Sequence, residues 1–414
     1  MTSRRRFLSL VAAGTAGWAS VPSEAGARLV ELSTGGSLDE SFWRLVKAEF
    51  PVRPGLVMMN AANLCPSPFA VRDAVTQYTR DIDSDASFQN RAKFRALREE
   101  ARGAIAAMVG ADDNEIALTR NTSEGNNTVV HGLALETGDE VVVWDENHPT
   151  NLRSWEVRGA REGFTVRKVA VDQASDPVQP FLAAMNANTR VLAFSHLSNV
   201  TGRLLPAQRL CQEASRRGIR TLVDGAQTFG SLELDLHGMG CDFFSSSSHK
   251  WFLGPKEAGI LYVRQEMQDE LTASDVGIGW DSAVENGAQK FESLGQRDDA
   301  CVTAMGTAAA FQNRIGPKVV EARVRELAEA LMNGLSASIP GVQFATPPQA
   351  EARAGVVIFS LPGTDTREAF NRLYHEFNVA GAPQRDGIRL SPHIYNTLDD
   401  VEIAVKAATR IAAD

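Results

Sequence analysis

The sequence lacks the features that mark a nucleic-acid-binding protein, a zinc protein or a membrane protein. It has no long basic block and a net charge of −9, so nucleic acid is not an expected partner. Its four cysteines show no short paired spacing, and its seven histidines form no His-Glu-x-x-His pattern. The common metal motifs are therefore missing, and we expect no metal. No apolar run reaches the roughly 20 residues that span a bilayer, so we expect no stable membrane anchor.

What remains is the composition of an ordinary globular protein. The 414 residues are 43% hydrophobic and 22% charged, which is enough for a large core and more than one domain. Internal repeats and low-complexity segments are missing too. The four cysteines are expected to be separate, mostly buried thiols, although an oxidising compartment would permit disulfides between them. They are Cys65, Cys211, Cys241 and Cys301.

The first 27 residues differ from the rest of the chain. Arg4-Arg5-Arg6 precedes an apolar run at 7–19, and Ala25-Gly26-Ala27 follows as a small-x-small cleavage pattern. The paired arginines before Phe7-Leu8 resemble a twin-arginine (Tat) export signal. We therefore expect a periplasmic protein that uses the Tat export machinery. An ordinary Sec signal and an uncleaved anchor are the alternatives.

Most of the chain alternates short apolar strands with helices, which predicts a mostly parallel sheet. Strands are expected at 116–119, 140–143, 191–195, 220–223 and 259–263. Helices are expected around 42–50, 69–110, 206–217, 300–315 and 318–338. Four arginines at 91, 95, 98 and 102 share one helix face, which for most of them predicts a solvated charged surface. Ligands of such sheets bind beyond the carboxyl ends of the strands.

The stretch at 221–250 carries the clearest chemistry. An apolar run delivers an acid, Asp224, and an amide, Gln227, follows three residues later. A polar run of four serines and a histidine then ends at Lys250. A lysine can form an imine with an aldehyde cofactor, and an acid at a strand end can hold a protonated pyridine nitrogen. Together these residues predict a pyridoxal 5'-phosphate (PLP) site.

The sequence resembles the class V family of PLP-dependent aminotransferases, in its isopenicillin N epimerase and cysteine desulfurase branch. Two motifs carry the resemblance: Val-Asp-Gly-Ala-Gln at 223–227 and Ser-x-His-Lys at 247–250. The resemblance runs from about Leu56 to about Glu402. It implies an α/β protein of PLP-dependent transferase fold type I, with a mostly parallel sheet in a large domain and a smaller α+β C-terminal domain. The implied division is a signal peptide at 1–27, an N-terminal arm at 28–60, a large PLP-binding domain at 61–298 and a small domain at 299–414.

The resemblance also implies roles for single residues. Lys250 is expected to hold the cofactor as a Schiff base, Asp224 to hold the ring nitrogen and His148 to stack on the ring. These three form the expected catalytic set. The other expected cofactor ligands are Thr122, Ser123, Ser247 and His249 at the phosphate, and Asn199 and Gln227 at the phenolic oxygen. Arg389 is expected to bind the substrate carboxylate, for which a guanidinium fork is suited. Asn63 is a second candidate for substrate binding.

Several of these residues have a structural alternative. Thr122 or Ser123 can be a simple helix N-cap, and His148 can be an ordinary surface residue of a loop. Asn63 can be a turn residue, and Arg389 can belong to a structural salt bridge. The resemblance further implies a homodimer, because the family's threonine at position 296 reaches the phosphate of the partner subunit. Gln296 stands there in this chain.

The expected reaction begins with loss of the Cα proton of an amino acid, with Lys250 as general base. Return of the proton to Cα on the other face gives epimerisation, its return to the cofactor carbon gives transamination, and loss of a β- or γ-group gives a lyase. The sequence leaves this choice open. A cysteine desulfurase or other C–S or selenocysteine lyase is less expected, because the segment 379–389 lacks the nucleophilic cysteine of that branch. A non-catalytic PLP-binding protein is the remaining alternative.

Overall fold

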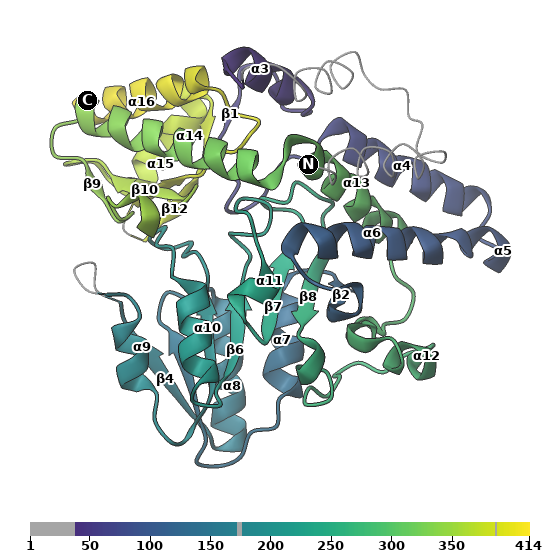
Figure 1. The fold of residues 1–414 in the computed structure, drawn as a ribbon. Helices are drawn as coiled ribbons and strands as arrows, with labels where there is room; N and C mark the ends of the chain where they lie inside the picture. Colours follow the sequence, from purple (N-terminus) through teal and green to yellow (C-terminus); the bar gives the residue numbers. More distant parts are fainter. Residues whose placement is uncertain (1–37, 172–175, 386) are drawn as a thin grey trace, which may run out of the picture.

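The computed structural model describes residues 38–171, 176–385 and 387–414. Its centre is a seven-stranded sheet in the order β2-β8-β7-β6-β5-β3-β4, in which β8 alone runs antiparallel to its neighbours (Figure 1). The expectation of a mostly parallel sheet is confirmed. The strands are β2 (Ile116–Thr119), β3 (Glu140–Trp144), β4 (Thr165–Val169), β5 (Thr189–Ser195), β6 (Arg220–Asp224), β7 (Phe243–Ser247) and β8 (Gly259–Val263).

Both faces of this sheet are buried. Successive residues of a strand point to opposite faces, so β3 places Val142 and Trp144 in one core cluster and Val141 and Val143 in the other. The strands therefore read as continuous apolar runs rather than alternating ones. The helices around the sheet are α7 (Thr122–Gly132), α8 (Pro149–Glu162), α9 (Gln179–Ala184), α10 (Ala207–Ser215), α11 (Leu236–Met239) and α12 (Trp280–Val284).

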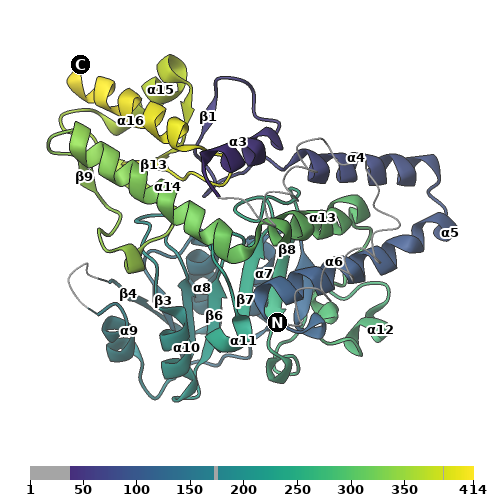
Figure 2. The same cartoon turned by 45° about the horizontal axis from the view of Figure 1, so that its top comes forward.

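The helical region expected at 69–110 is interrupted. It forms α4 (Phe69–Ser84), α5 (Phe88–Arg91) and α6 (Lys93–Val109). Asp85 is extended, and the side chain of Ser87 accepts a hydrogen bond from the backbone of Asn90, so a new helix begins there. Helix α13 (Asp299–Ile315) packs against both α4 and α6, as Figure 2 shows.

The prediction of a solvated arginine face on this region is wrong for Arg102. Its side chain is 1% exposed, donates to the carbonyl of Ile116 at 2.6 Å and forms ion pairs with Glu99 and Glu292. A buried guanidinium needs such partners, because an unpaired charge in the interior is costly. The sequence spacing predicted that the arginines share one helix face, but it could not predict that Glu292 pairs with Arg102.

A second, smaller unit has its own core. Four antiparallel strands in the order β12-β13-β10-β9 pack with three long helices. These elements are β9 (Gln343–Phe344), β10 (Val357–Ser360), β12 (Ala382–Gln384), β13 (Gly387–Leu390), α14 (Pro317–Ser338), α15 (Thr366–Phe377) and α16 (Leu398–Ala413). The expectation of a smaller α+β C-terminal domain is confirmed.

The N-terminal arm packs on this smaller unit. Helix α3 (Glu40–Ala48) forms an ion pair from Lys47 to Asp400 at 2.7 Å, and strand β1 (Val57–Met58) pairs in parallel with β11 (Val379–Ala380). The predicted signal peptide at 1–27 lies outside the described residues. Within the described part of the chain, no helix has both the length and the apolar character needed to cross a bilayer.

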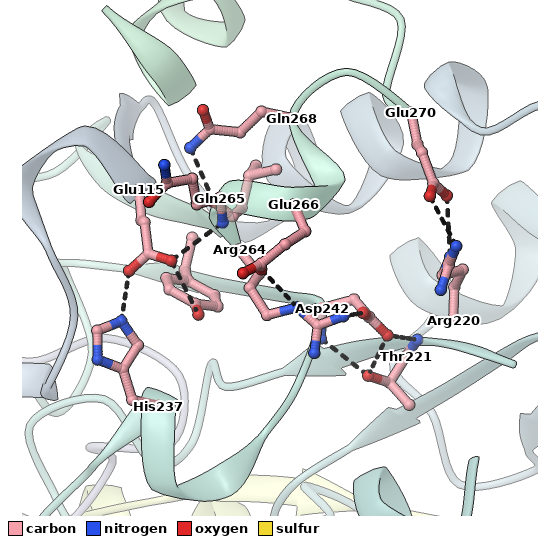
Figure 3. A network of polar contacts seen from close by, with 12 residues as sticks. Glu115, Arg220, Thr221, His237, Asp242, Arg264, Gln265, Glu266, Gln268 and Glu270 are labelled. Atoms are coloured by element: carbon pink, nitrogen blue, oxygen red, sulfur yellow. Dashed lines mark hydrogen bonds and ion pairs between the residues drawn. The ribbon is translucent and has the colours of Figure 1, made fainter. Parts of the chain in front are cut away.

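Short 3-10 helices and a polar network close the edge of the sheet opposite the carboxyl ends of β6 and β7. The 3-10 helices there are η2 (Asp113–Glu115), η3 (Gln265–Met267) and η4 (Gly287–Glu292), whereas η5 (Ala350–Ala352) lies between β9 and β10 and accepts from the backbone of Leu204. In the network, Glu115 accepts from His237 at 2.6 Å, and Asp242 binds the start of β6 and pairs with Arg264 (Figure 3).

Glu115, His237 and Asp112 offer metal-ligand atoms within 4.8 Å of one another. However, both oxygens of Glu115 already accept protein hydrogen bonds: one from Asp112 N–H and His237, the other from Gln265 N–H and Tyr262. We therefore interpret the group as a packing contact.

Candidate active site

The expected site lies at the carboxyl ends of the parallel strands. Asp224 is the last residue of β6, and its register partners are Ser195 at the end of β5 and Ser245 of β7. Lys250 follows three residues after the end of β7. The parallel pairing of these strands explains how residues far apart in sequence meet at one edge.

Asp224 is buried and held at both oxygens. Its side chain is 3% exposed, Oδ1 accepts from the N–H of Ala226 at 3.0 Å, and Oδ2 accepts from Nδ2 of Asn126 at 2.9 Å. The following residue must be a glycine, because a Cβ at Gly225 would lie 1.8 Å from the ring of Phe244. The missing side chain therefore lets the ring of Phe244 pack directly against the backbone after Asp224.

Lys250 lies at the start of a constrained loop between β7 and β8. Ser248 N–H donates to Ala258 and Gly254 N–H donates to Ser248, so the loop folds back on itself. Leu253 adopts a φ of 63°, which is strained for a residue with a branched side chain and is typical of functional sites.

Burial lowers the pKa of Lys250, and the neighbouring Arg389 lowers it further, while Asp224 opposes the decrease. A lysine with a lowered pKa is more easily deprotonated, which suits a nucleophile or a base. The electrostatic influence of Asp224 and Arg389 on this amine also shows that the three groups share one site.

Neither Thr122 nor Ser123 is the N-cap of α7, so the alternative of a simple helix cap is wrong for both. Asn121 is the cap, and its side chain accepts from the N–H of Glu124 at 3.0 Å. Thr122 is the first helical residue, and both its N–H and its hydroxyl contact Oγ of Ser247, at 2.8 and 2.6 Å. A helix N-terminus with hydroxyl groups beside it is a favourable place for an anionic group.

The two histidines of the expected site are only partly exposed. His148 caps α8, and its Nδ1 lies 3.0 Å from Oγ1 of Thr150. Burial lowers the pKa of His148, Lys250 and Arg389 lower it further, and Asp224 opposes them, so the net shift favours the neutral ring. Burial also lowers the pKa of His249 to about 4.

Arg389 is a buried cation without an anionic partner among the described residues. The side chain is 5% exposed, Nη1 donates to the carbonyl of Asn199 at 3.3 Å, and Nε has no hydrogen-bond partner. Burial lowers its pKa to about 10. None of the described carboxylates forms an ion pair with Arg389. The alternative of a structural salt bridge therefore gains no support. A buried, unpaired guanidinium is the group expected to bind an incoming carboxylate.

The roles expected for Gln227, Asn63 and Gln296 stay predictions. The amide of Gln227 is held at both ends: it donates to the carbonyl of Ala62 at 3.0 Å and accepts from Trp251 at 2.7 Å. Asn63 is exposed, and Gln296 is exposed with its oxygen 2.9 Å from Nη2 of Arg91.

Sequence reasoning missed three residues that contact the expected site. Asn126 contacts Asp224, while Ser245 and Thr150 contact Asn126. Asn126 lies four residues after Thr122, so both point to the same face of α7. That spacing was visible in the sequence, but the contact with β6 depends on how the helix packs on the sheet.

The four cysteines are free in the structure, and three of them are buried. Burial raises the pKa of three thiols to about 12 and that of the fourth well above its ordinary value. The thiolate is the nucleophilic form, so these residues are poorly suited to attack a substrate. The three thiols with a pKa near 12 are Cys65, Cys211 and Cys301.

The residues present fit PLP. A buried carboxylate suits a protonated ring nitrogen, a helix N-terminus with hydroxyls suits a phosphate, and Lys250 with its lowered pKa suits an aldehyde. The orphaned Nε of Arg389 leaves a donor for a substrate carboxylate beside them. The set therefore offers complementary chemistry to each part of the cofactor and to an amino acid.

Comparisons with known proteins agree with this interpretation. An isopenicillin N epimerase from Streptomyces clavuligerus is 31% identical over 382 residues, covering 87% of this chain and 96% of that protein. A cysteine desulfurase from Synechococcus elongatus is 28% identical over 407 residues, covering 88% of this chain and 63% of that protein. The crystal structure of an Escherichia coli cysteine desulfurase superposes with a TM-score of 0.80 at 25% identity, covering 91% of this chain and 98% of the other.

The family model described as aminotransferase class-V matches residues 59–403, most of the chain. The fold, the composition of the site and these matches lead to one assignment. The chain belongs to the class V aminotransferase family of PLP-dependent enzymes.

Proposed function

We propose that the protein is an isopenicillin N epimerase-like enzyme that removes the Cα proton of an amino acid, acting as an epimerase or an aminotransferase. The observation that carries the proposal is Arg389, a buried guanidinium with an unpartnered Nε in the same site as Lys250. An amino acid whose carboxylate binds Arg389 would have its Cα held near the lysine. Bound PLP would supply the sink for the electrons left at Cα.

In this proposal the chain's own residues divide the work. Asp224 would hold the ring nitrogen of the cofactor, while Thr122, Ser123, Ser247 and His249 would hold its phosphate. The ring of His148 would cover the cofactor, and its lowered pKa favours the neutral form, which adds no positive charge next to Lys250. Asn199 and Gln227 would contact the phenolic oxygen.

Lys250 is proposed as the base at Cα. Its lowered pKa increases the neutral fraction of the amine near neutral pH, and an amine must be deprotonated before it can act as a general base. Delivery of the proton by the same amine to the cofactor carbon would give transamination. Epimerisation would instead require a proton to reach Cα on the face opposite the one from which Lys250 removed it.

A cysteine desulfurase or other C–S lyase is the second candidate, favoured by the relatives and by the superposed structure. Two observations weigh against it. The segment 379–389 that precedes Arg389 contains no cysteine, and all four thiols of the chain have raised pKa values. A persulfide-forming thiol would need the opposite environment.

The test is a screen of l- and d-amino acids with the purified, PLP-loaded protein. Product chirality, keto acid and sulfide are followed in parallel. The proposal predicts inversion of chirality or a keto acid for at least one amino acid, and no sulfide from cysteine. Sulfide release as the dominant activity would make the second candidate correct.

We also propose a homodimer. Phe88 is 86% exposed, and Val276 and Ile278 are 66% and 98% exposed, so these apolar side chains are accessible to a partner subunit. A partner subunit would cover them and bring its own groups toward Gln296. Sedimentation at micromolar concentration checks this, and a monomer with full activity would refute it.

Finally, we propose export by the Tat route to the periplasm, which the twin arginines Arg4-Arg5 support. The cofactor ligands are scattered through the chain and meet only after folding, so a folded export route fits. Changing both arginines to lysine should leave active precursor in the cytoplasm. If the variant still reaches the periplasm and is cleaved after Ala27, a Sec signal is the correct interpretation.

A further inference from the structure

Asn126 lies at the centre of a buried polar network that no predicted role includes. The side chain is fully buried on α7. Its Nδ2 donates to Oδ2 of Asp224 at 2.9 Å, and its Oδ1 accepts from the hydroxyl of Ser245. The amide nitrogen of Asn126 therefore donates to Asp224 at the end of β6, and its amide oxygen is held by Ser245 of β7.

The contact determines how the carboxylate is oriented. Asp224 accepts one hydrogen bond at each oxygen, from Ala226 N–H and from Asn126. Two donors at the two oxygens define the plane of the carboxylate and leave each oxygen with acceptor capacity. Without Asn126, Oδ2 would lose its protein donor and the carboxylate could rotate about its last bond.

The same amide reaches the histidine of the site through one hydroxyl. Nδ2 of Asn126 lies 3.4 Å from Oγ1 of Thr150, and this oxygen lies 3.0 Å from Nδ1 of His148. Asp224 and His148 are thus joined through Asn126 and Thr150. These two side chains therefore connect the acid proposed for the ring nitrogen with the histidine proposed to cover the cofactor.

The packing of α7 on the sheet makes this reach possible. A Cβ on the preceding residue, Gly125, would lie 2.9 Å from Cβ of Ser245. The missing side chain lets the helix approach β7 closely enough for the hydroxyl of Ser245 to donate to Asn126. The hydrogen bond from Ser245 to the buried amide of Asn126 therefore depends on the close approach of α7 to β7.

We propose that Asn126 is a positioning residue that fixes the carboxylate of Asp224 and, through Thr150, the ring of His148, and thereby strengthens cofactor binding and catalysis. This inference rests on the proposed roles of Asp224 and His148 at PLP. It does not depend on which product is formed.

The test compares Asn126→Leu with Asn127→Leu. Asn127 is the adjacent amide on the same helix, but its Nδ2 donates to the backbone of Ser123 and makes no contact with Asp224. Affinity is measured by adding PLP to the apo-protein and following tryptophan fluorescence. The pH dependence of the bound cofactor's absorbance and the split between kcat and KM are measured in parallel.

We expect Asn126→Leu to weaken PLP binding about 10- to 100-fold, by analogy with the loss of outer partners at metal sites. The absorbance titration should shift, and kcat should fall more than KM changes. Asn127→Leu should stay within about twofold of wild type. Equal PLP affinity and an unshifted titration in Asn126→Leu would overturn the proposal, as would an equal loss in Asn127→Leu.

Ser245→Ala provides the second variant if Asn126→Leu does not fold. It removes the donor to Oδ1 of Asn126 and leaves the amide free to turn, so PLP affinity should fall in the same direction by a smaller factor. Unchanged affinity in a folded Ser245→Ala protein would then refute the proposal. Because these affinities are measured without substrate, they are independent of the amino-acid screen that tests the reaction.

Discussion

Replacing Arg389 by leucine should separate activity from stability. The guanidinium is 5% exposed, and no described carboxylate pairs with it. Its charge is therefore a cost to the folded state, and the cost is offset only when a carboxylate binds. Leucine removes the charge and the binding site together.

The lowered pKa gives the size of this cost. A decrease from 12.5 to about 10, caused by burial, corresponds to about 3 kcal/mol at about 1.4 kcal/mol per tenfold. The pKa of Arg389 is lower in the folded protein than its ordinary value. The charged form therefore destabilises the fold at every pH below the folded-state pKa. Removing the charge recovers this energy, while the smaller side chain loses packing contacts of about 1–3 kcal/mol. The two effects nearly cancel.

Catalysis should respond very differently. Loss of a buried, charge-assisted contact to a carboxylate costs about 2–5 kcal/mol. This corresponds to a decrease in kcat/KM of roughly 30- to several thousand-fold, at about 1.4 kcal/mol per tenfold. Simple amines without a carboxylate should lose much less.

Chemical denaturation and steady-state kinetics on the same preparations measure both effects. Arg323→Leu is the control for stability, because Arg323 is 1% exposed but paired with Glu40 and Glu326, so we expect a loss of about 3–5 kcal/mol. Arg385→Ala, at an exposed position, is the control for activity. If Arg389→Leu destabilises as much as Arg323→Leu, or if amines and amino acids lose activity alike, Arg389 is structural.

Three further predictions concern the lysine, the cysteines and pH. Lys250→Ala should abolish the cofactor adduct that borohydride traps and nearly all activity, whereas Lys256→Ala should keep the adduct; peptide mapping of an adduct to Lys256 would refute the assignment. A variant with all four cysteines changed to serine or alanine should retain most cofactor chemistry if it folds, and a persulfide found by mass spectrometry during turnover would contradict this. Glu115 raises the pKa of His237, so the stabilisation by this pair is present below pH 6.5 and lost as pH rises through the raised value. The difference in unfolding free energy between wild type and His237→Gln should therefore shrink from pH 6 to higher pH, and a constant difference would show that the pair does not titrate.

Local patterns were enough to predict much of the sheet. The strands expected at 116–119 and 259–263 are those observed, because short buried apolar runs bounded by polar residues leave little choice. The motif around Asp224 and Lys250 predicted the family. In each case the information is carried by residues close together in sequence.

Other features depend on contacts between distant segments and could not be predicted. The burial of Arg102 requires Glu292, and the role of Asn126 requires α7 to pack on β6 and β7. Asn121 is the N-cap of α7, and the hydroxyl residues Thr122 and Ser123 that follow it are not. The hydroxyl of Thr122 instead forms a hydrogen bond with Ser247. Several adjacent residues could have capped the helix, and tertiary contacts decided among them.

The central claim, that Lys250 takes the Cα proton of an amino acid, is tested most directly by hydrogen exchange. The PLP-loaded protein is incubated with a panel of amino acids in deuterium oxide, and deuterium at Cα is measured by mass spectrometry and proton NMR. The account predicts Cα deuterium in at least one amino acid, with wild type but not with Lys250→Ala. No exchange in any amino acid with a fully loaded protein, or equal exchange in the Lys250→Ala variant, would contradict it.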